Sequence, residues 1–454
     1  MGAGKTTLGA EVARRLDRHF IDLDDAIEVG EGAPIADLFR RGDFRLLEET
    51  YATRVLATRP PMVLALGGGA VTSEVIRAGL RLHASSVLVP VDVDEARRRV
   101  EGSARPLAGD EEAFRTLFDD RAPVYRDVAD AEAHDADGIV LAAAGVHIEA
   151  GALGRLGDLV PGRDPVALVA DARVAGILGP DAQLALGARV ASTHELPAGE
   201  EAKTLAACER LWRELTLDRG GTIVALGGGA TTDAAGFVAA TFLRGVPWVA
   251  VPTTLVGQVD AAIGGKTGIN LEHGKNLVGA FRWPLRTVTD PSLLGTLPER
   301  ELSAGMAEAV KTGLLAGEEL WELPLPELVR RCAAFKAAVC LRDPWERGPR
   351  AVLNLGHTFA HALEAASGYA LPHGDAVALG LSAALRLSGL STDVVDEVLR
   401  PRPVRVDRDD AWAALKRDKK GERVYVLLEA PGRPIVTTLP DEDARRALDS
   451  LIAG

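Results

Sequence analysis

The sequence predicts an α/β protein in three parts: a parallel-sheet domain with a phosphate loop, a Rossmann-like α/β domain, and an all-α domain at the C-terminal end. Apolar runs of strand length alternate with helical patterns through the first part, which indicates a parallel sheet. Glycine triplets follow strand-like runs at residues 67–69 and 227–229, and such turns open helices that bind phosphate groups. Beyond residue 300 the pattern is mostly helical.

The composition narrows the class of protein. The 454 residues are enough for about three domains, and 47% hydrophobic with 26% charged residues is typical of a globular protein. A net charge of −13 without a long basic run disfavours nucleic acid and anionic membranes as partners. No apolar run reaches the roughly 18 residues of a membrane span.

Two further features favour a cytoplasmic location. Cys208, Cys332 and Cys340 fit no metal or disulfide framework, as expected in a reducing compartment. The phosphate loop begins at residue 2, which leaves no room for a signal peptide.

Residues 2–7, GAGKTT, match the end of a phosphate loop, whose full pattern is G-x-x-x-x-G-K-[ST]. In such a loop the backbone and the lysine hold phosphates, and the next hydroxyl binds Mg²⁺. A helix is expected from Leu8 to Leu16. The first glycine of the pattern and the strand before it would precede Met1, so we expect either an upstream start or a domain without its first strand.

Strands are expected at residues 20–24, 62–66 and 87–91, and a helix over residues 92–100. The first of these strands ends in two acids, placed to assist Mg²⁺ and to act as a base. Together with Gly42-Asp-Phe-Arg, the triplet at 67–69, Arg105-Pro-Leu and Arg121-Ala-Pro-Val-Tyr, these motifs resemble shikimate kinase over about residues 1–137.

The resemblance implies ATP with Mg²⁺ as cofactor and shikimate as substrate. The implied phosphate and nucleotide contacts are Gly2, Ala3, Gly4, Lys5, Thr6, Thr7, Arg98 near the adenine, and Arg105, which would close over the phosphates. The implied Mg²⁺ ligands are Thr6 and Asp22, with Asp24 as the base. Arg45, Gly68 and Arg121 would hold shikimate. The alternatives are a solvated helix face for Arg98 and, for the whole segment, a non-catalytic nucleotide-binding module.

The stretch 129–144 is rich in Ala and Asp and lacks aromatic residues, so we predict domains at 1–137, 138–300 and 301–454. In the second domain an apolar strand at 165–170 ends in Asp171, and an acid there can hold a nucleotide ribose. Residues 259–276 combine Gly, Lys, Thr and Asn at a density that suits a bound anion.

The third domain contains the histidines that suggest a metal. His357 and His361 are four residues apart in a helix expected over 358–366, so both point the same way. His373 follows in a turn flanked by Pro and Gly. With a carboxylate, these imidazoles predict a Zn²⁺ site. The alternative is a helix start at which the histidines serve as caps.

Residues 227–237, 252–270, 274–276, 303–313, 353–364 and 373–380 resemble 3-dehydroquinate synthase, and the likeness spans about 146–430. It implies Zn²⁺, with Co²⁺ as a substitute, held by Glu308, His357 and His373. His361, a ligand on spacing alone, would instead lie near the substrate. Two departures are Asp375, where the family has Glu, and a short stretch between Gly374 and Lys419.

The same resemblance implies NAD and a sugar phosphate substrate. The positions implied for NAD are Asp171, Glu200, Lys203, Gly228, Gly229, Asp233, Thr253, Thr254 and Thr296, with Lys266 and Lys275 beside them. The catalytic and substrate positions implied are Asp260, Lys266, Asn276, Lys311, Lys336, His361 and Arg350, with Arg244 and Lys275 at the phosphate and Lys420 in the C-terminal wall.

The implied reaction converts 3-deoxy-arabino-heptulosonate 7-phosphate to 3-dehydroquinate and phosphate. NAD accepts a hydride and returns it, so there is no net oxidation, and Zn²⁺ acts as a Lewis acid. Both resemblances belong to aromatic amino acid biosynthesis, and the synthase family implies a homodimer. The alternative enzyme is an NAD- and metal-dependent polyol dehydrogenase, which would produce NADH.

Overall fold

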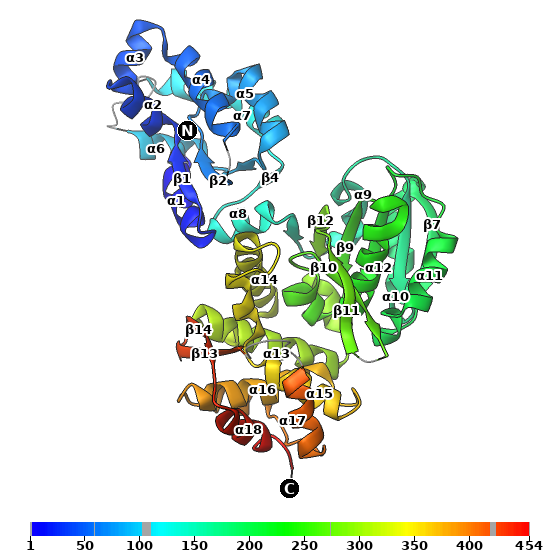
Figure 1. Ribbon diagram of the computed structural model, residues 1–454. Coiled ribbons are helices and arrows are strands. Elements are labelled where there is room, and N and C mark those ends of the chain that lie inside the picture. Colours follow the sequence, from blue (N-terminus) through cyan, green and yellow to red (C-terminus); the bar gives the residue numbers. More distant parts are fainter. Residues whose placement is uncertain (1, 59, 102–109, 273, 418–423, 454) are drawn as a thin grey trace. The chain divides into compact units, whose positions relative to one another are not determined.

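The computed structural model describes residues 2–58, 60–101, 110–272, 274–417 and 424–453. The chain divides into two compact units, residues 1–144 and residues 145–454 (Figure 1). Each unit has its own hydrophobic core, so each is described by itself.

In the first unit, helices alternate with short strands. Its elements are α1 (Lys5–Arg15), β1 (His19–Asp22), α2 (Leu23–Glu31), α3 (Ile35–Arg41), α4 (Phe44–Leu56), β2 (Met62–Ala65), α5 (Glu74–His83), β3 (Val87–Leu88), α6 (Val93–Val100), α7 (Glu111–Val128), β4 (Ala131–Glu132) and α8 (Ala136–Ala143). β1 pairs with β2 and β3 with β4, both in parallel. The parallel arrangement agrees with the predicted alternation of strands and helices.

One local prediction for this unit needs correction. The strand expected over residues 87–91 ends at Leu88, because its partner β4 is only two residues long and pairs Leu88 with Glu132. The Ala- and Asp-rich stretch forms the helix α8: Asp135 accepts a hydrogen bond from the backbone of Gly138 at 2.8 Å and so caps the helix.

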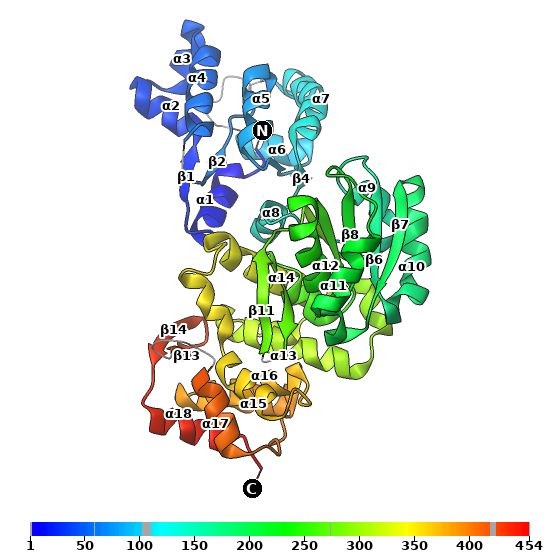
Figure 2. The same cartoon turned by 45° about the vertical axis from the view of Figure 1, so that its right-hand side comes forward.

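The second unit is built on a six-stranded parallel sheet with the order β5-β12-β9-β8-β6-β7 (Figures 1 and 2). The strands are β5 (Val146–Ile148), β6 (Val166–Asp171), β7 (Val190–Leu196), β8 (Thr222–Gly227), β9 (Trp248–Pro252) and β12 (Arg286–Thr289). Every residue of β6, β8 and β9 is buried. Helices on both faces explain why these strands are almost continuously apolar in sequence.

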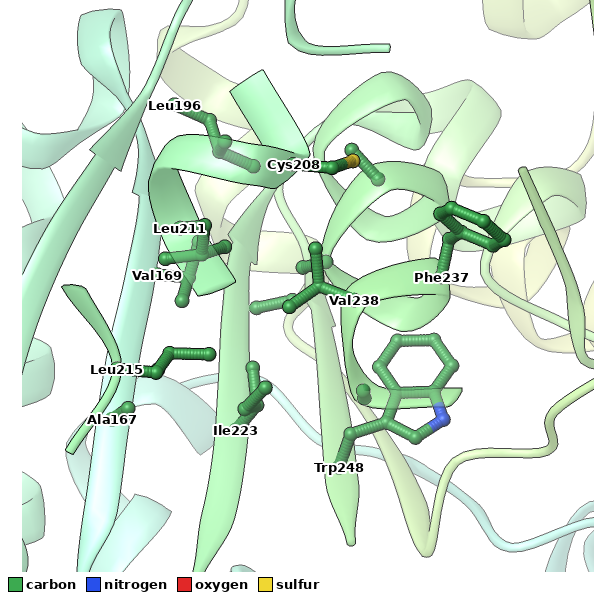
Figure 3. Packing of buried hydrophobic residues seen from close by; sticks show 14 of the residues in the cluster. Ala167, Val169, Leu196, Cys208, Leu211, Leu215, Ile223, Phe237, Val238 and Trp248 are labelled. Atoms are coloured by element: carbon green, nitrogen blue, oxygen red, sulfur yellow. The ribbon is translucent and has the colours of Figure 1, made fainter. Parts of the chain in front are cut away.

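The two faces of the sheet have separate cores. On one face, Ala167 and Val169 of β6 pack with residues of α11 (Leu205–Glu214) and α12 (Gly229–Thr241), as Figure 3 shows. On the other face, Leu168 packs with α9 (Leu156–Leu159) and α10 (Ala172–Leu186). The alternation along β6 follows from the two-residue period of a strand.

After the last strand of the sheet, the described residues are mostly helical, as predicted, and they also form an antiparallel pair of strands at 424–430 and 433–438. The remaining elements are β10 (Lys266–Leu271), β11 (Gly274–Phe281), α13 (Glu299–Ala316), α14 (Leu325–Arg342), α15 (His357–Ala366), α16 (His373–Leu387), α17 (Arg408–Arg417), β13 (Val424–Ala430), β14 (Arg433–Thr438) and α18 (Asp441–Asp449). The hairpin β13–β14 is antiparallel. In the described residues, no helix has both the length and the apolar character to cross a membrane.

One prediction at the histidines was wrong. His373 does not lie in a turn, because it is the first residue of α16. Pro372 precedes it as the N-cap with φ −62°, a φ that proline already has and that leads directly into a helix. The Pro-Gly flank therefore marks the start of a helix. The helix expected over 358–366 is confirmed as α15.

Candidate active sites

In the first unit, the phosphate loop leads into α1, and its polar side chains converge on one carboxylate. Lys5 Nζ lies 3.0 Å from Asp22 Oδ2, and the Thr6 hydroxyl donates to the same oxygen at 2.6 Å. Asp24 lies 3.9 Å from the Lys5 ammonium. Burial alone would raise the pKa of Asp22, but the Thr6 hydroxyl and the Lys5 ammonium lower it below its ordinary value. An ionised acid beside a lysine and a hydroxyl suits a phosphate-bound Mg²⁺.

A second group of polar residues surrounds the glycine triplet at 67–69. Arg45 forms an ion pair with Glu48, and Arg121 Nη1 donates to the Gly68 carbonyl at 3.1 Å. The hydroxyl of Tyr125 donates to the same carbonyl at 2.5 Å. Two guanidinium groups at a glycine turn can hold a carboxylate with hydroxyl groups beside it.

Gly67 joins these two groups. A Cβ there would lie 2.6 Å from Asp24 Oδ1 and 2.7 Å from Glu48 Oε1, so any larger residue would have to displace one of the two acids. Glu48 is 2% exposed, and burial raises its pKa although Arg45 opposes the shift. The sequence analysis gave Glu48 no role in the site; its position three residues after Arg45 on α4 was the available signal.

The helix α6 lies beside the phosphate loop, because Arg99 Nη1 donates to the Gly2 carbonyl at 3.2 Å. A Cβ on Gly2 would approach the Ala96 carbonyl of α6 to 2.5 Å. Arg98 of α6 lines a surface pocket with neighbouring charged residues. Arg105 lies outside the described residues.

In the second unit, the residues predicted for NAD follow neighbouring strands at their carboxyl ends. Asp171 ends β6 and is 5% exposed, Gly228 follows β8, and Thr253 follows β9. The chain passes from β6 outward to β7 and then returns to β8 on the other side of β6. This reversal creates the crevice where open α/β sheets bind ligands.

At this edge, neighbouring side chains pack closely against Gly228 and Gly229. A Cβ on Gly228 would lie 3.0 Å from Thr254 Cγ2, and one on Gly229 would lie 2.9 Å from the Ala261 Cβ. The turn thus leaves the N-terminus of α12 open to a ligand. A helix N-terminus carries partial positive charge, which suits a pyrophosphate.

A polar network continues from this edge to the hairpin β10–β11. Lys203 Nζ donates to Asp233 Oδ2 at 2.6 Å and also to Asn276 Oδ1. Asn270 Nδ2 donates to Glu200 Oε2 at 2.6 Å, and its Oδ1 accepts from the Asn276 backbone at 2.9 Å. Asn276 has φ +57°, an uncommon conformation that this network holds in place.

Not every predicted residue joins the cluster. Arg244 is exposed at the far end of α12 with φ +69°, and Thr296 is exposed at the end of a short helix, residues 291–296. Lys420 lies outside the described residues.

The candidate metal site consists of Glu308 from α13, His357 from α15 and His373 from α16. One ligand atom from each lies within 4.8 Å of the others. Glu308 Oε1 is 3.4 Å from His357 Nε2 and 3.2 Å from His373 Nε2. His357 Nδ1 lies 3.1 Å from the Leu355 carbonyl and can donate to it, which leaves Nε2 facing Glu308.

The close packing of these charged groups shifts the pKa values of Glu308 and His373. Burial alone would raise the pKa of Glu308, but the Lys311 ammonium and His357 hold it well below its ordinary value. Burial would lower the pKa of His373, but its hydrogen bonds with Glu308 and Glu364 raise it to about 10. His361 lies outside this cluster, although its ring centroid is 5.6 Å from that of His357.

Two buried lysines and an aspartate adjoin the candidate metal site. Lys311 Nζ lies 2.5 Å from Glu308 Oε2 and 3.4 Å from Asp260 Oδ1. Lys336 Nζ lies 2.6 Å from Asp260 Oδ2. Burial alone would raise the pKa of Asp260, but the two ammonium groups lower it to about 2. The four side chains form a chain of alternating charge.

The loop between α14 and α15 adds two contacts. Glu346, with φ +53°, pairs with Lys266 at 2.6 Å. Arg350 is 1% exposed and donates to the Gly264 carbonyl at 3.0 Å. Asp343 accepts hydrogen bonds from the backbone of Arg347, Gly348 and Arg350, which fixes the loop.

Glu346 and Glu364 join the site although the sequence predicted no role for either. No local pattern marks Glu346, since the fold alone brings it to Lys266. Glu364 lies seven residues after His357 and three after His361 on α15, so helical periodicity was a usable signal. It contacts Lys275 and His373.

The comparisons with known proteins agree with both resemblances. Residues 1–144 match the family model for shikimate kinase, residues 193–304 the model for the N-terminal part of 3-dehydroquinate synthase, and residues 305–420 the model for its C-terminal part. A 3-dehydroquinate synthase from Symbiobacterium thermophilum is 41% identical in an alignment 341 positions long, which covers 66% of this chain and 95% of the relative.

Solved structures match the same region. A 2-deoxy-scyllo-inosose synthase complexed with carbaglucose-6-phosphate, NAD⁺ and Co²⁺ is 25% identical, with a TM-score of 0.61, over 67% of this chain and 96% of that one. The 2-epi-5-epi-valiolone synthase from Streptomyces hygroscopicus subsp. jinggangensis 5008, with NAD⁺ and Zn²⁺ bound, is also 25% identical, with a TM-score of 0.60. The match covers 67% of this chain and 96% of that one.

Proposed function

Because the chain belongs to the 3-dehydroquinate synthase family and carries a shikimate kinase domain in residues 1–144, we propose that it performs two reactions of aromatic amino acid biosynthesis. The second unit converts 3-deoxy-arabino-heptulosonate 7-phosphate to 3-dehydroquinate and phosphate. The first unit transfers a phosphoryl group from ATP to shikimate. These matches favour the synthase over a polyol dehydrogenase and an active kinase over a non-catalytic module.

The observation that carries the synthase proposal is the row of alternating charges that runs from Glu308 of the candidate metal site through Lys311 to Asp260. A dehydrogenase needs a metal and NAD, but not a row of lysines. In the proposed site, Lys311 and Lys336 hold Asp260 ionised, so that it accepts hydrogen bonds from substrate hydroxyls. Lys266, Lys275 and Arg350 supply positive charge for the carboxylate and phosphate of the substrate.

The residues present fit a divalent metal and NAD. One carboxylate and two imidazoles within 4.8 Å are the donor set of an open catalytic zinc site. When bound, NAD supplies a hydride acceptor that is regenerated in each cycle, and the metal supplies a Lewis acid. We assign NAD to the crevice after β6, β8 and β9, where Asp171 accepts ribose hydroxyls and the Gly228 turn meets the pyrophosphate. His361 and Asn276 complete the substrate contacts.

In the kinase unit we assign Lys5 to the ATP phosphates and Thr6 with Asp22 to Mg²⁺. Asp24 accepts the proton of the attacking shikimate hydroxyl. The Lys5 ammonium, 3.9 Å away, holds the Asp24 carboxylate near the phosphate loop. Arg45 and Arg121 bind the shikimate carboxylate beside Gly68.

We also propose that the synthase unit forms a homodimer. The hairpin β10–β11 exposes Leu271, Leu277 and Val278 at 37%, 54% and 37%. Exposed apolar side chains grouped on one element are typical of protein interfaces. Light scattering after size exclusion measures the mass, and a monomer at micromolar concentration would contradict the proposal.

The synthase is tested on the full chain with heptulosonate phosphate, catalytic NAD and Zn²⁺. Release of phosphate with formation of dehydroquinate, and without net NADH, is the expected result. The His373→Ala variant should lose both the metal and the activity, whereas His83→Ala, in the first unit, should keep both. Net NADH without release of phosphate would support the dehydrogenase instead.

The kinase is tested on the same preparation by ATP-dependent phosphorylation of shikimate. The Asp24→Asn variant should lose turnover while the synthase reaction is unchanged, because the two sites belong to separate compact units. Absence of kinase turnover in a chain with normal synthase activity would leave only the synthase half of the proposal.

A further inference from the structure

Glu364 is a buried carboxylate that the proposed mechanism does not use. It is 3% exposed and lies on α15, two helical turns after His357. A buried carboxylate is costly unless cations or hydrogen-bond donors compensate it. Its partners therefore indicate what it does.

Both of its partners belong to the proposed synthase site. Glu364 Oε1 lies 3.0 Å from Lys275 Nζ and 3.6 Å from His373 Nδ1. The other ring nitrogen of His373 faces Glu308 at 3.2 Å. A single oxygen thus lies between a lysine proposed to bind the phosphate and a histidine proposed to bind the metal.

The lysine is held from a second side by Tyr369. Lys275 Nζ lies 4.8 Å from the centroid of the Tyr369 ring. Tyr369 has φ +64°, and its backbone N–H donates to the Glu364 carbonyl at 2.7 Å. A left-handed conformation is unfavourable for a residue other than glycine, and such strain persists where the surroundings fix it. The turn after α15 thus keeps the ammonium next to Glu364.

We propose that Glu364 is a positioning residue that couples the metal site to the anion site. A metal-bound histidine normally donates its second N–H to a carboxylate or carbonyl, which orients the ring and strengthens the ligand. Here Lys275 competes for the carboxylate oxygen that would accept from His373. An anion that engages Lys275 frees Glu364 to support His373, so anion binding raises metal affinity. By reciprocity the metal raises anion affinity by the same factor.

This inference rests on the proposed synthase function, but it is tested without turnover. The metal-stripped full chain is titrated with Co²⁺, which is followed by its visible absorption, with and without inorganic phosphate. In the wild-type chain, phosphate should tighten Co²⁺ binding about 5-fold, near the low end of ordinary coupling. Glu364→Gln should weaken Co²⁺ binding about 10- to 100-fold and abolish the effect of phosphate. The matched control is Glu429→Gln, at an exposed position of β13, which should behave as the wild type.

A second variant guards against a folding defect in Glu364→Gln. Lys275→Met should mimic the bound anion: Co²⁺ binds more tightly than to the wild type, and phosphate has no further effect. In the double variant with Glu364→Gln, the gain from Lys275→Met should vanish, which excludes simple repulsion between the lysine and the metal.

The inference would be overturned if a folded Glu364→Gln chain bound Co²⁺ with wild-type affinity and responded to phosphate as the wild type does. It would also be overturned if the tighter Co²⁺ binding of Lys275→Met persisted in the double variant. Failure of the proposed function has a different result, namely a wild-type chain that binds Co²⁺ but does not release phosphate from heptulosonate phosphate.

Discussion

Several charged side chains of the two candidate sites lie at different depths, although the first unit also buries Asp22 and Glu48. In the first unit, the side chains of Lys5, Asp24 and Arg45 are 28%, 31% and 43% exposed. In the second unit, those of Lys311 and Glu308 are 2% and 1% exposed. The surrounding sheets differ in the same way, since most residues of β1 and β2 are only half-buried whereas β6, β8 and β9 are fully buried.

This difference sets what each site contributes to the stability of its own unit. Partly exposed charges are screened by water, so an ion pair among them contributes little. Buried charges must compensate one another, and the loss of one leaves its partner without a counter-charge. We therefore expect loss of the buried Lys311 to reduce both stability and activity, and loss of the partly exposed Lys5 to reduce activity alone.

The largest expected effect is that of Lys311→Met. This change leaves Glu308 and Asp260 without the ammonium between them, so the free energy of unfolding of the second unit should fall by about 3–5 kcal/mol. Synthase turnover should fall by about 10²–10³-fold. Stability is measured by denaturant unfolding with a chelator present, so that no metal compensates Glu308.

The matched control for this prediction is Lys416→Met. Lys416 is exposed on α17, where its ammonium lies 5.6 Å from the centroid of the Trp412 ring. Its loss should cost less than about 1 kcal/mol. Equal destabilisation by the two substitutions would show that the burial of Lys311 between two carboxylates does not determine the loss of stability.

Asp260→Asn should have the next largest effect, and the effect should depend on pH. The pKa of Asp260 is lowered to about 2, since Lys311 and Lys336 outweigh the opposing effect of burial. A lowered pKa contributes stability above the ordinary pKa near 4, and this contribution is lost as the pH falls through 2. The substitution should cost about 2 kcal/mol at pH 7. The gap should narrow below about pH 4, and a gap that widens there would contradict the assignment of charge.

The sequence predicted the fold and the sites best where a residue type is used mainly in one structural setting. The fold class is confirmed because the buried strands β6, β8 and β9 are continuous apolar runs. The chain has 52 basic residues, of which only nine are lysines. Six of these lysines lie in the two candidate sites: Lys5, Lys203, Lys266, Lys275, Lys311 and Lys336. A compact ammonium fits between carboxylates where a guanidinium does not.

The sequence was uninformative where a contact joins distant segments. Glu346 meets Lys266 across 80 positions, and neither residue carries a local signal for the other. The length of β3 depended on a partner more than 40 residues away. The metal group shows the same limit: spacing along α15 pointed to His361, whereas Glu308 of α13 completes the cluster through packing between helices.

Asp343→Asn should have a smaller effect on stability, because it affects a loop rather than a buried pair of charges. The Asp343 carboxylate accepts three backbone N–H groups of residues 347–350, and these bonds lower its pKa against the opposing effect of burial. An amide retains part of this acceptor capacity, so we expect a loss of about 1–2 kcal/mol.

The same loop carries Glu346 and Arg350, so the Asp343→Asn variant should also weaken substrate binding. We expect KM for heptulosonate phosphate to rise more than kcat falls, because the loop positions groups that hold the substrate. The control is Asp393→Asn, at an exposed position that follows α16. Unchanged KM with reduced stability would restrict the role of Asp343 to the fold.

The smallest expected effect on stability is that of Lys5→Met, and it is the counterpart of Lys311→Met. Lys5 is partly exposed, and without it Asp22 keeps its hydrogen bonds from the Thr6 hydroxyl at 2.6 Å and the Asp24 backbone at 3.1 Å. The free energy of unfolding of the first unit should therefore change by less than about 1 kcal/mol. Shikimate phosphorylation should nevertheless fall by about 10²-fold or more, because the change removes the ammonium that we propose to bind the ATP phosphates. A loss of stability as large as that from Lys311→Met would mean that exposure does not separate the two sites, and that the phosphate loop is as much part of its core as the lysines are in the second unit.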